Sequence, residues 1–254
     1  MEHASPSEAA TGDGATFRSV SGWRAARHAL LCRHGDTATL LSTRSWAYFG
    51  LNATACTAWA ALTGGQSVSE VARSLATTCG VPLDAVRADV DRLVGTLERL
   101  QFLTRDDEPT PAHRQWTPPR RRASAWRPPT RLACTEALLW AGVRLRTSTL
   151  DPESWLAASP DDDAPVLSVA DADRATWELR RAAAWLPAKT YCLLQSVALV
   201  RVLRQRGVDA RLRLGARPYP FVAHAWVESG RLAVNETDEQ LAMYAPFEPA
   251  RGAR

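Results

Sequence analysis

One cysteine and one histidine in the C-terminal half of the chain occur where they could act together on a peptide bond. Cys192 follows Thr190 in "PAKTYCLLQSVALVRVLRQRG", in which Pro187 ends the preceding segment and Thr190 is a good helix cap. A thiol in the first turn of a helix lies near the positive end of the helix dipole, which favours the thiolate. Free N–H groups of that turn can also bind a developing oxyanion. The pattern predicts a nucleophilic Cys192 on a buried helix that runs to Arg206.

The second reactive residue is His224, the only histidine after His113, in the segment "PFVAHAWVESGRLAVNE". Its small and apolar neighbours predict a half-buried strand. The region thus reads helix, strand, strand, strand, with the cysteine on the helix and the histidine on the second strand, 32 residues later. Papain-like and transglutaminase-like cysteine enzymes have this order, and in them the histidine takes the thiol proton while a third residue orients the imidazole.

The hairpin after His224 decides which residue could be that third member. If the turn that begins at Ser229 has two residues, His224 faces Asn235; if it has three, His224 faces Glu236. A shift of one residue moves every side chain to the other face of the strand, so only one register can hold. Asp238 is a further candidate, and all three acidic or amide residues could instead be exposed turn residues.

The same caution applies to the cysteines, because a cysteine is more often a small buried hydrophobe than a nucleophile. That alternative stays open for Cys192. We expect Cys32, Cys56, Cys79 and Cys134 to be structural, and Cys134 lies inside an apolar helical segment. The five form no C-x-x-C pair, and an odd, scattered set favours a reducing cytoplasm over a disulfide framework. No motif predicts a metal site or a cofactor.

Composition indicates a globular protein of 254 residues, enough for one large domain or two small ones. A net charge of +4, from 31 basic and 27 acidic residues, does not argue for nucleic acid. The polar N-terminus is no signal peptide and no apolar run is long enough for a membrane, so we expect a cytoplasmic protein. We divide the chain into a disordered tail (1–16), a first domain (17–106), a Pro/Arg-rich linker (107–130) and a second domain (131–254).

The first domain reads as α+β, with three strands followed by three helices. The run "ALLCRHGDTATLLSTRSWAYFGL" predicts the strands, and the segments that begin at Asn52, Ser67 and Pro82 predict the helices. This order is that of a small winged helix-turn-helix. Arg73 is the only cation on the helix that would read DNA, so DNA binding is the weaker interpretation.

Residues 26–105, and above all "LLSTRSWAYFGLNATACTAWAALTGG", resemble the PqqD-like recognition element of ribosomally made, modified peptides (RiPPs). The resemblance implies that a leader peptide adds as an antiparallel strand to Ser45–Leu51 and lies against the helix 83–101. It implies these substrate-binding residues: Ser45, Trp46, Ala47, Tyr48, Phe49, Val90, Leu93, Val94 and Leu97. Strand alternation allows only about half of the strand residues to face a ligand, and the rest pack in the core.

Residues 131–247, with "YCLLQSVALVRVLRQRG" and "AHAWVESGRLAVNE", resemble the transglutaminase-like peptidase of lasso-peptide biosynthesis. Together with the first domain, the chain is similar to a fused lasso-peptide B protein. The resemblance implies a transglutaminase/papain-like α+β domain, with a central cysteine helix packed on an antiparallel sheet. It assigns catalysis to Cys192 and His224. The family has an aspartate after an asparagine where this chain has Glu236 after Asn235, so we favour Glu236 as the third member.

The implied function is a leader peptidase that binds the precursor leader by strand addition and cleaves the leader–core amide. The resemblance also implies two partners, the ribosomally made precursor peptide and an asparagine-synthetase-like macrolactam synthetase that takes the freed core. Two alternatives remain at this stage: a transglutaminase-like acyltransferase with an amine acceptor, and a non-catalytic protein that delivers the leader to other enzymes.

Overall fold

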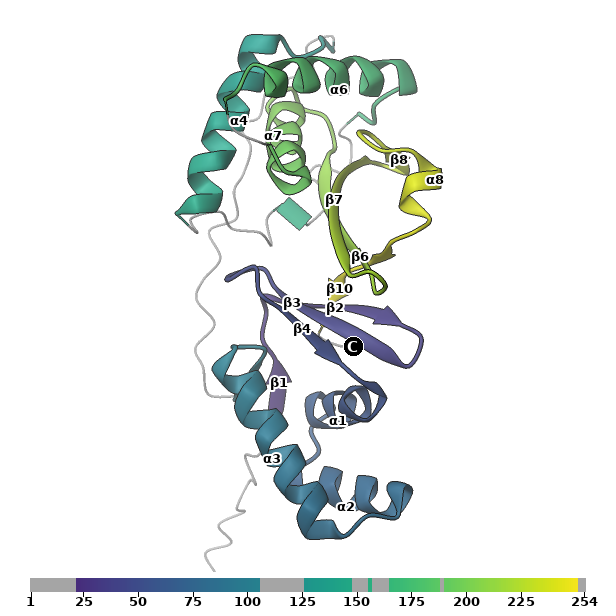
Figure 1. Ribbon diagram of the computed structural model, residues 1–254. Helices are drawn as coiled ribbons and strands as arrows, with labels where there is room; N and C mark the ends of the chain where they lie inside the picture. Colours follow the sequence, from purple (N-terminus) through teal and green to yellow (C-terminus); the bar gives the residue numbers. More distant parts are fainter. Residues whose placement is uncertain (1–21, 106–125, 148–154, 157–164, 188–189, 251–254) are drawn as a thin grey trace, which may run out of the picture.

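The computed structural model describes residues 22–105, 126–147, 155–156, 165–187 and 190–250 (Figure 1). The predicted tail and most of the predicted linker lie outside these ranges. The described part forms two domains, one below the other in Figure 1. No helix in these ranges is long and apolar enough to cross a membrane.

The N-terminal domain has an antiparallel sheet with helices on one face. Its strands are β2 (Ala29–His34), β3 (Thr37–Ser42) and β4 (Tyr48–Leu51), and its helices are α1 (Ala53–Thr63), α2 (Val68–Cys79) and α3 (Leu83–Arg99). Asn52 caps α1 through Ala55 N, and Ser67 and Glu70 form a reciprocal capping box on α2, as the sequence predicts. A separate two-stranded sheet, β1 (Trp23–Ala25) with β5 (Leu103–Arg105), was not predicted.

The third strand begins three residues later than predicted, at Tyr48 instead of Ser45. Ser45 lies in a turn, where its backbone N–H donates to Ser42 Oγ over 3.3 Å. Trp46 has a φ of 57°, in the left-handed region that extended strands do not use. The turn therefore takes up the residues that local β propensity assigned to the strand.

The C-terminal domain packs three helices on an antiparallel sheet. The helices are α4 (Arg131–Arg146), α6 (Val169–Ala184) and α7 (Cys192–Arg204), followed after the sheet hairpins by the short α8 (Asp238–Leu241). The strand order is β8-β7-β6-β9, with β6 (Arg211–Arg217), β7 (Val222–Ser229), β8 (Leu232–Ala233) and β9 (Ala245–Pro246). In Figure 1, α7 lies between α4 and β7. Apolar residues surround α7 on most sides, and eight of its residues are buried, which confirms the predicted central helix on an antiparallel sheet.

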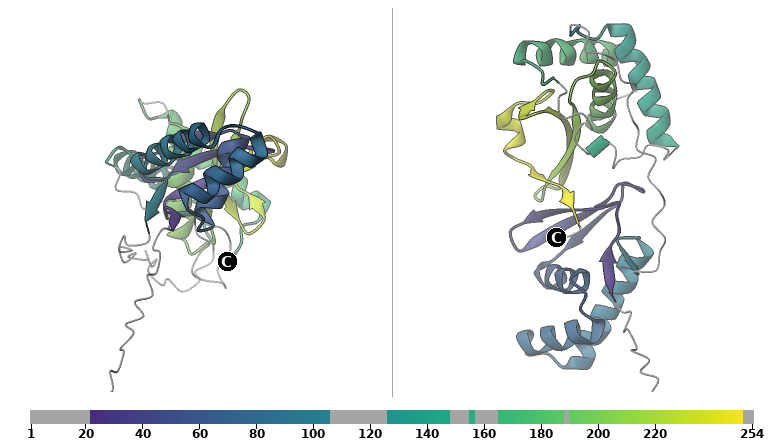
Figure 2. Two further views of the ribbon diagram at one scale, coloured as in Figure 1. Left: turned by 90° about the horizontal axis from the view of Figure 1, so that it is seen from below. Right: turned by 180° about the vertical axis from the view of Figure 1, so that it is seen from behind.

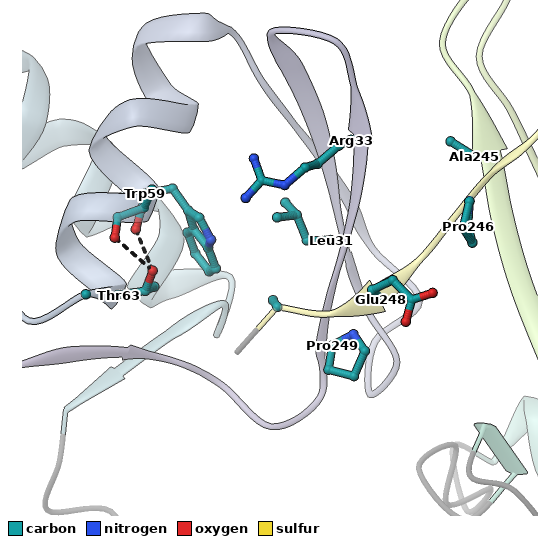
Figure 3. Close-up of a pocket in the computed structure, with 11 residues that line it drawn as sticks. Leu31, Arg33, Trp59, Thr63, Ala245, Pro246, Glu248 and Pro249 are labelled. Carbon is teal, nitrogen blue, oxygen red and sulfur yellow. Dashed lines mark hydrogen bonds between the residues drawn. The ribbon is translucent and has the colours of Figure 1, made fainter. Parts of the chain in front are cut away.

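The C-terminal end of the chain returns to the N-terminal sheet. β10 (Glu248–Pro249) pairs antiparallel with β2, so the sheet order is β10-β2-β3-β4, and Ala250 N donates to Ala29 O over 3.0 Å. Figure 2 shows this strand beside β2 from behind. A cavity of about 540 Å³ is lined by residues of this segment, by Leu31 and Arg33 of β2 and by Trp59 of α1 (Figure 3). The predicted division, which places all residues from 131 onward in the second domain, did not include this pairing.

The two domains share a hydrophobic core across the N-terminal sheet. Leu40 belongs to the core beneath the helices of the N-terminal domain, whereas Leu30, Cys32 and Leu41 are buried in the core of the C-terminal domain. This division follows from strand alternation, which sends successive side chains to opposite faces. Cys32 Sγ also donates to Ala245 O over 3.1 Å. Both faces of the sheet are therefore covered.

Candidate active site

Cys192 is the first residue of α7, as predicted, but the cap is one residue later than expected. Tyr191 is the N-cap and makes no side-chain capping bond. Thr190 instead accepts two hydrogen bonds from the Gln195 amide, at 2.8 Å to its hydroxyl and 3.2 Å to its carbonyl. The helix ends at Arg204, two residues short of the predicted end. The thiol nevertheless lies at a helix N-terminus, where backbone N–H groups are free for an anion.

His224 lies in the middle of β7, opposite Gly215 of β6. Its Nε2 is 3.0 Å from Glu236 Oε1. The imidazole stacks on two aromatic rings, Tyr244 at 5.1 Å and Trp226 at 6.3 Å between centroids. The contact with Glu236 and the two stacked rings together hold the imidazole in one orientation. Trp226 follows from the sequence by alternation along the strand, but no local signal links Tyr244 to the site.

The thiol and the imidazole shift each other's proton affinity. Burial raises the pKa of Cys192, but hydrogen bonds with His224 and with the backbone of Ala225 and Leu193 outweigh it, so the pKa is lower than usual. The hydrogen bond with Cys192 raises the pKa of His224 against the effect of burial, and Glu236 adds to the rise. Both shifts are therefore in the direction of a thiolate and an imidazolium.

Cys134 is the contrast within the same domain. Burial, with a further contribution from Glu178, raises the pKa of its thiol to about 11, and the nearby Arg206 offsets only part of this rise. All five cysteines are free thiols. Only Cys192, among the cysteines with a shifted pKa, has it lowered. No three His, Cys, Asp or Glu side chains within the described ranges are grouped to hold a metal ion.

The hairpin after β7 has neither of the two registers considered from the sequence. Ser229 pairs with Leu232 and Glu228 with Ala233, so the loop is Gly230–Arg231. The pairing stops at Ala233, and the residues beyond it are free of the strict alternation of a strand. Glu236 reaches His224 from this segment and not from a paired strand. Both predicted registers were wrong because they placed Ser229 in the turn, whereas Ser229 is the last paired residue of β7.

Asn235 makes a different set of contacts. Its Oδ1 accepts a hydrogen bond of 2.7 Å from Val227 N, and its Nδ2 donates over 3.4 Å to Ser196 Oγ of α7. The Ser196 hydroxyl in turn donates to Ala225 O over 2.9 Å. Asn235 thus joins the segment before Glu236 to both β7 and α7. Asp238 is exposed in the first turn of α8.

Gly215 is required where β6 passes beneath the site. A Cβ at this position would lie 2.9 Å from Trp226 ring carbons and 2.9 Å from Ala245 O. Real Cβ atoms do not approach other atoms so closely, so a larger residue would displace the Trp226 ring, which stacks on His224. The sequence gives no sign of this requirement, because it arises from two strands and a ring that are distant in the chain.

Cys192 and His224 line a cavity of about 40 Å³. The other lining residues come from both domains: Trp46, Tyr48, Leu193, Leu214, Gly215, Ala223, Ala225 and Phe247. Tyr48 packs edge-on against Phe221 at 5.2 Å and at a tilt on Phe247 at 6.2 Å. Two residues that the resemblance assigned to leader binding, Trp46 and Tyr48, therefore line the same cavity as Cys192 and His224.

The remaining predicted leader-binding residues are divided between a groove and the core. A groove of about 590 Å³ lies between β4, α1 and α3, with Phe49, Val90 and Leu93 among its lining residues. Val94 and Leu97 do not line this groove and are buried in the N-terminal core. Ser45 is exposed and Ala47 is half-buried, both in the turn before β4. The edge of β4 away from β3 has no strand paired to it among the described residues.

Comparison with known families identifies both domains. Residues 134–248 match the model of the transglutaminase-like superfamily, and residues 38–103 match that of coenzyme PQQ synthesis protein D (PqqD). The chain therefore combines a PqqD domain with a transglutaminase-like domain, as the sequence resemblance predicts, in an α+β fold.

Two further proteins are similar to parts of the chain. The microcin J25-processing protein McjB of Escherichia coli is 46% identical over 48 residues, which is 19% of this chain and 23% of that protein. The match thus spans less than a quarter of the length of this relative. The solved structure "TbiB1 in Complex with the TbiA(beta) Leader Peptide" has a TM-score of 0.31 and 20% identity, and the alignment covers 34% of this chain and 99% of that one.

Proposed function

We propose that this protein is the leader peptidase of a lasso-peptide pathway: it binds the leader of a ribosomally made precursor and hydrolyses the leader–core amide. The observation that carries the proposal is the Cys192–His224 pair, whose pKa values are shifted in opposite directions on a transglutaminase-like domain. The PqqD match and the similarity to a microcin-processing protein support the assignment of the substrate.

In the proposed reaction, Cys192, His224 and Glu236 act as nucleophile, acid–base and orienting group. The Cys192 thiolate attacks the carbonyl carbon, and the helix N-terminus stabilises the oxyanion. The His224 imidazolium gives its proton to the amine as the C–N bond breaks, which leaves a thioester. His224 then removes a proton from water, the hydroxide attacks the thioester, and the thiol leaves with its proton restored. The products are a leader carboxylate and a core amine.

Leader binding is proposed at the edge of β4 and in the groove beside α3. Strand addition would satisfy the unpaired backbone groups of β4, and the apolar groove lined by Phe49, Val90 and Leu93 would take alternate side chains. The strand runs from Tyr48, near Cys192, to Leu51, near α1. An antiparallel leader therefore has its C-terminal end toward Tyr48, which directs the scissile bond to the catalytic pocket. A parallel leader would point away from it.

The wider setting belongs to the same proposal. We expect the core amine to pass to an asparagine-synthetase-like macrolactam synthetase in the cytoplasm. The division into a recognition domain (17–106), a linker (107–130) and a peptidase domain (131–254) is proposed with one addition, that Glu248–Ala250 complete the sheet of the recognition domain.

Incubating the purified protein with its precursor peptide tests the function, because mass spectrometry distinguishes the three possible outcomes. Hydrolysis gives two fragments whose masses sum to the precursor plus water. An acyltransferase would instead join an added amine to the acyl fragment. A delivery protein would bind the precursor and leave its mass unchanged. The proposal requires the first result and the loss of both fragments with Cys192→Ala.

A further inference from the structure

The catalytic pocket has a wall that comes from the recognition domain. Trp46, in the turn before β4, and Tyr48, the first residue of β4, belong to the N-terminal domain, yet both line the cavity that Cys192 and His224 also line. Tyr48 is held there by edge-on packing against Phe221 of the other domain, at 5.2 Å between ring centroids. Trp46 packs on the C-terminal core. A peptide bound at Cys192 has to lie against these two rings.

Trp46 has an unfavourable backbone conformation. A φ of 57° lies in the left-handed region, which a bulky residue adopts only when the surrounding structure imposes it. Two hydrogen bonds hold the turn: Trp46 N donates to Ser42 O over 2.8 Å, and Ser42 N donates to Ala47 O over 2.9 Å. Glycine would fit this turn without strain. A tryptophan in such a position points to a use for its ring.

The pocket that the two rings enclose is small. Its volume of about 40 Å³ is only a few times the roughly 10–15 Å³ that one water molecule needs on the same measure. Gly215, Ala223 and Ala225, which have minimal side chains, form another part of the lining. The two aromatic rings, together with Leu193, Leu214 and Phe247, are therefore the bulky side chains that limit the space beside the thiol.

We propose that Trp46 and Tyr48 are specificity determinants of the peptidase, which restrict the substrate residue beside the scissile bond to a small side chain. The inference rests on the proposed function, and it assigns the recognition domain a second task. That domain both captures the leader and forms one side of the subsite. The specificity of cleavage is then a property of the two domains together and not of the transglutaminase-like domain alone.

The competing explanation is that both rings only hold the domains together. The two explanations differ in what they predict for different substrates. Loss of domain packing would lower kcat/KM by the same factor for every substrate. Removal of a subsite wall would change the ratio between large and small substrates, because a pocket discriminates by steric exclusion and by fit.

The test uses the full-length protein and precursor peptides that differ only at the residues flanking the scissile bond, with Gly, Ala, Leu or Phe on each side in turn. The wild-type protein should cleave the small-residue peptides with a kcat/KM roughly tenfold or more above that for Leu or Phe. Trp46→Gly keeps the turn conformation and removes the ring, and Tyr48→Ala opens the other wall. Each should reduce the ratio to roughly threefold or less by improving the large substrates.

Trp177→Ala is the matched control, since this ring is 61% exposed on α6, outside the pocket. It should leave both rate and preference unchanged. If Tyr48→Ala fails to fold, Tyr48→Leu retains apolar packing with less bulk and is measured in its place. A wild-type protein that cleaves none of the peptides overturns the proposed function and this inference with it. A wild-type protein that cleaves, with variants whose large-to-small ratio is unchanged, overturns this inference alone.

Discussion

His224 Nε2 lies 3.0 Å from Glu236 Oε1, and the contact joins a paired strand to a segment that has left the sheet. Both side chains are mostly shielded, with 18% and 17% exposed, so salt screens their attraction less than it does at the surface. An imidazole whose Nε2 faces the carboxylate presents Nδ1 to other partners, and the hydrogen bond with Cys192 is the one that raises its pKa most. The carboxylate thus sets the orientation in which the ring meets the thiol.

Glu236→Gln should slow turnover and move the alkaline limb of the pH–rate profile to lower pH. The carboxylate helps to raise the pKa of His224, so the amide leaves that pKa lower. The imidazolium that protonates the leaving amine is then lost at a lower pH. By comparison with other triads, the factor by which kcat falls should be roughly a hundred times smaller than for the removal of Cys192 or His224. Initial rates across a range of pH measure both effects.

Asn235→Ala is the control for this variant. Its amide holds Val227 N and Ser196 Oγ, so its loss should lower the melting temperature and reduce activity without moving the pH limbs. A crippled Asn235→Ala together with an unaffected Glu236→Gln would contradict our assignment and favour a Cys-His-Asn triad.

Cys192→Ala and His224→Ala should each abolish cleavage while the affinity for the leader stays near that of the wild type. In the proposed mechanism the thiol forms the acyl bond and the imidazole transfers both protons, whereas the proposed groove lies beside α3. Mass spectrometry follows the cleavage, and fluorescence anisotropy of a labelled leader follows the binding. Cys134→Ala, at a buried thiol with a raised pKa, is the matched control and should remain active. Continued proteolysis by Cys192→Ala would contradict the cysteine mechanism.

Gly215→Ala should impair catalysis although glycine takes no part in the chemistry. The added Cβ would lie 2.9 Å from the Trp226 ring, which stacks on His224. We expect a lower kcat and a lower melting temperature. Gly95→Ala is the matched change in α3, where nothing lies within 4 Å of the new Cβ, and it should stabilise the protein by about 1 kcal/mol. Equal behaviour of the two variants would show that the close approach at Gly215 is relieved at no cost.

Local signals in the sequence predict the helices and their caps well. Asn52 and the Ser67–Glu70 pair cap the helices that were expected from them, and Cys192 begins its helix. These caps and helix starts depend on residues that are three or four positions apart, so a short stretch of sequence is enough to predict them. The proposed roles of Cys192 as nucleophile and His224 as base rest on the same kind of signal, the positions of the two residues on their elements.

Features that depend on distant segments could not be predicted in this way. The pairing of β10 with β2 joins residues more than 200 positions apart, and no local pattern distinguishes Glu248–Pro249 from a loop. The contact of Glu236 with His224 occurs because the β8 ladder ends early, which depends on how Asn235 is bound by α7 and β7. Likewise, local β propensity placed Trp46 in a strand, whereas the turn imposes a φ of 57° that no local signal predicts.

The shared core predicts that the two domains unfold together. Leu41→Ala removes a side chain that is buried in the core of the C-terminal domain. Leu40→Ala, at the neighbouring position, removes one from the core of the N-terminal domain. Each should cost about 2–5 kcal/mol. Leu41→Ala should also weaken the contact between domains, so that a single thermal transition in the wild type separates into two. Calorimetry gives the result, and two transitions in the wild type would contradict a shared core.

Leu93→Ala separates capture of the leader from chemistry. This side chain is half-buried in the groove beside α3 and lies outside the catalytic pocket. Its loss should raise KM for the full precursor by roughly tenfold, the effect of about 1.4 kcal/mol of binding, and leave kcat unchanged. A short peptide that spans the scissile bond but lacks the leader has nothing to place in the groove, so the variant should cleave it as the wild type does. Steady-state kinetics on both substrates measure KM and kcat. An equal loss of kcat/KM on the short peptide would mean that the groove supports the fold of the active site and is not the leader receptor.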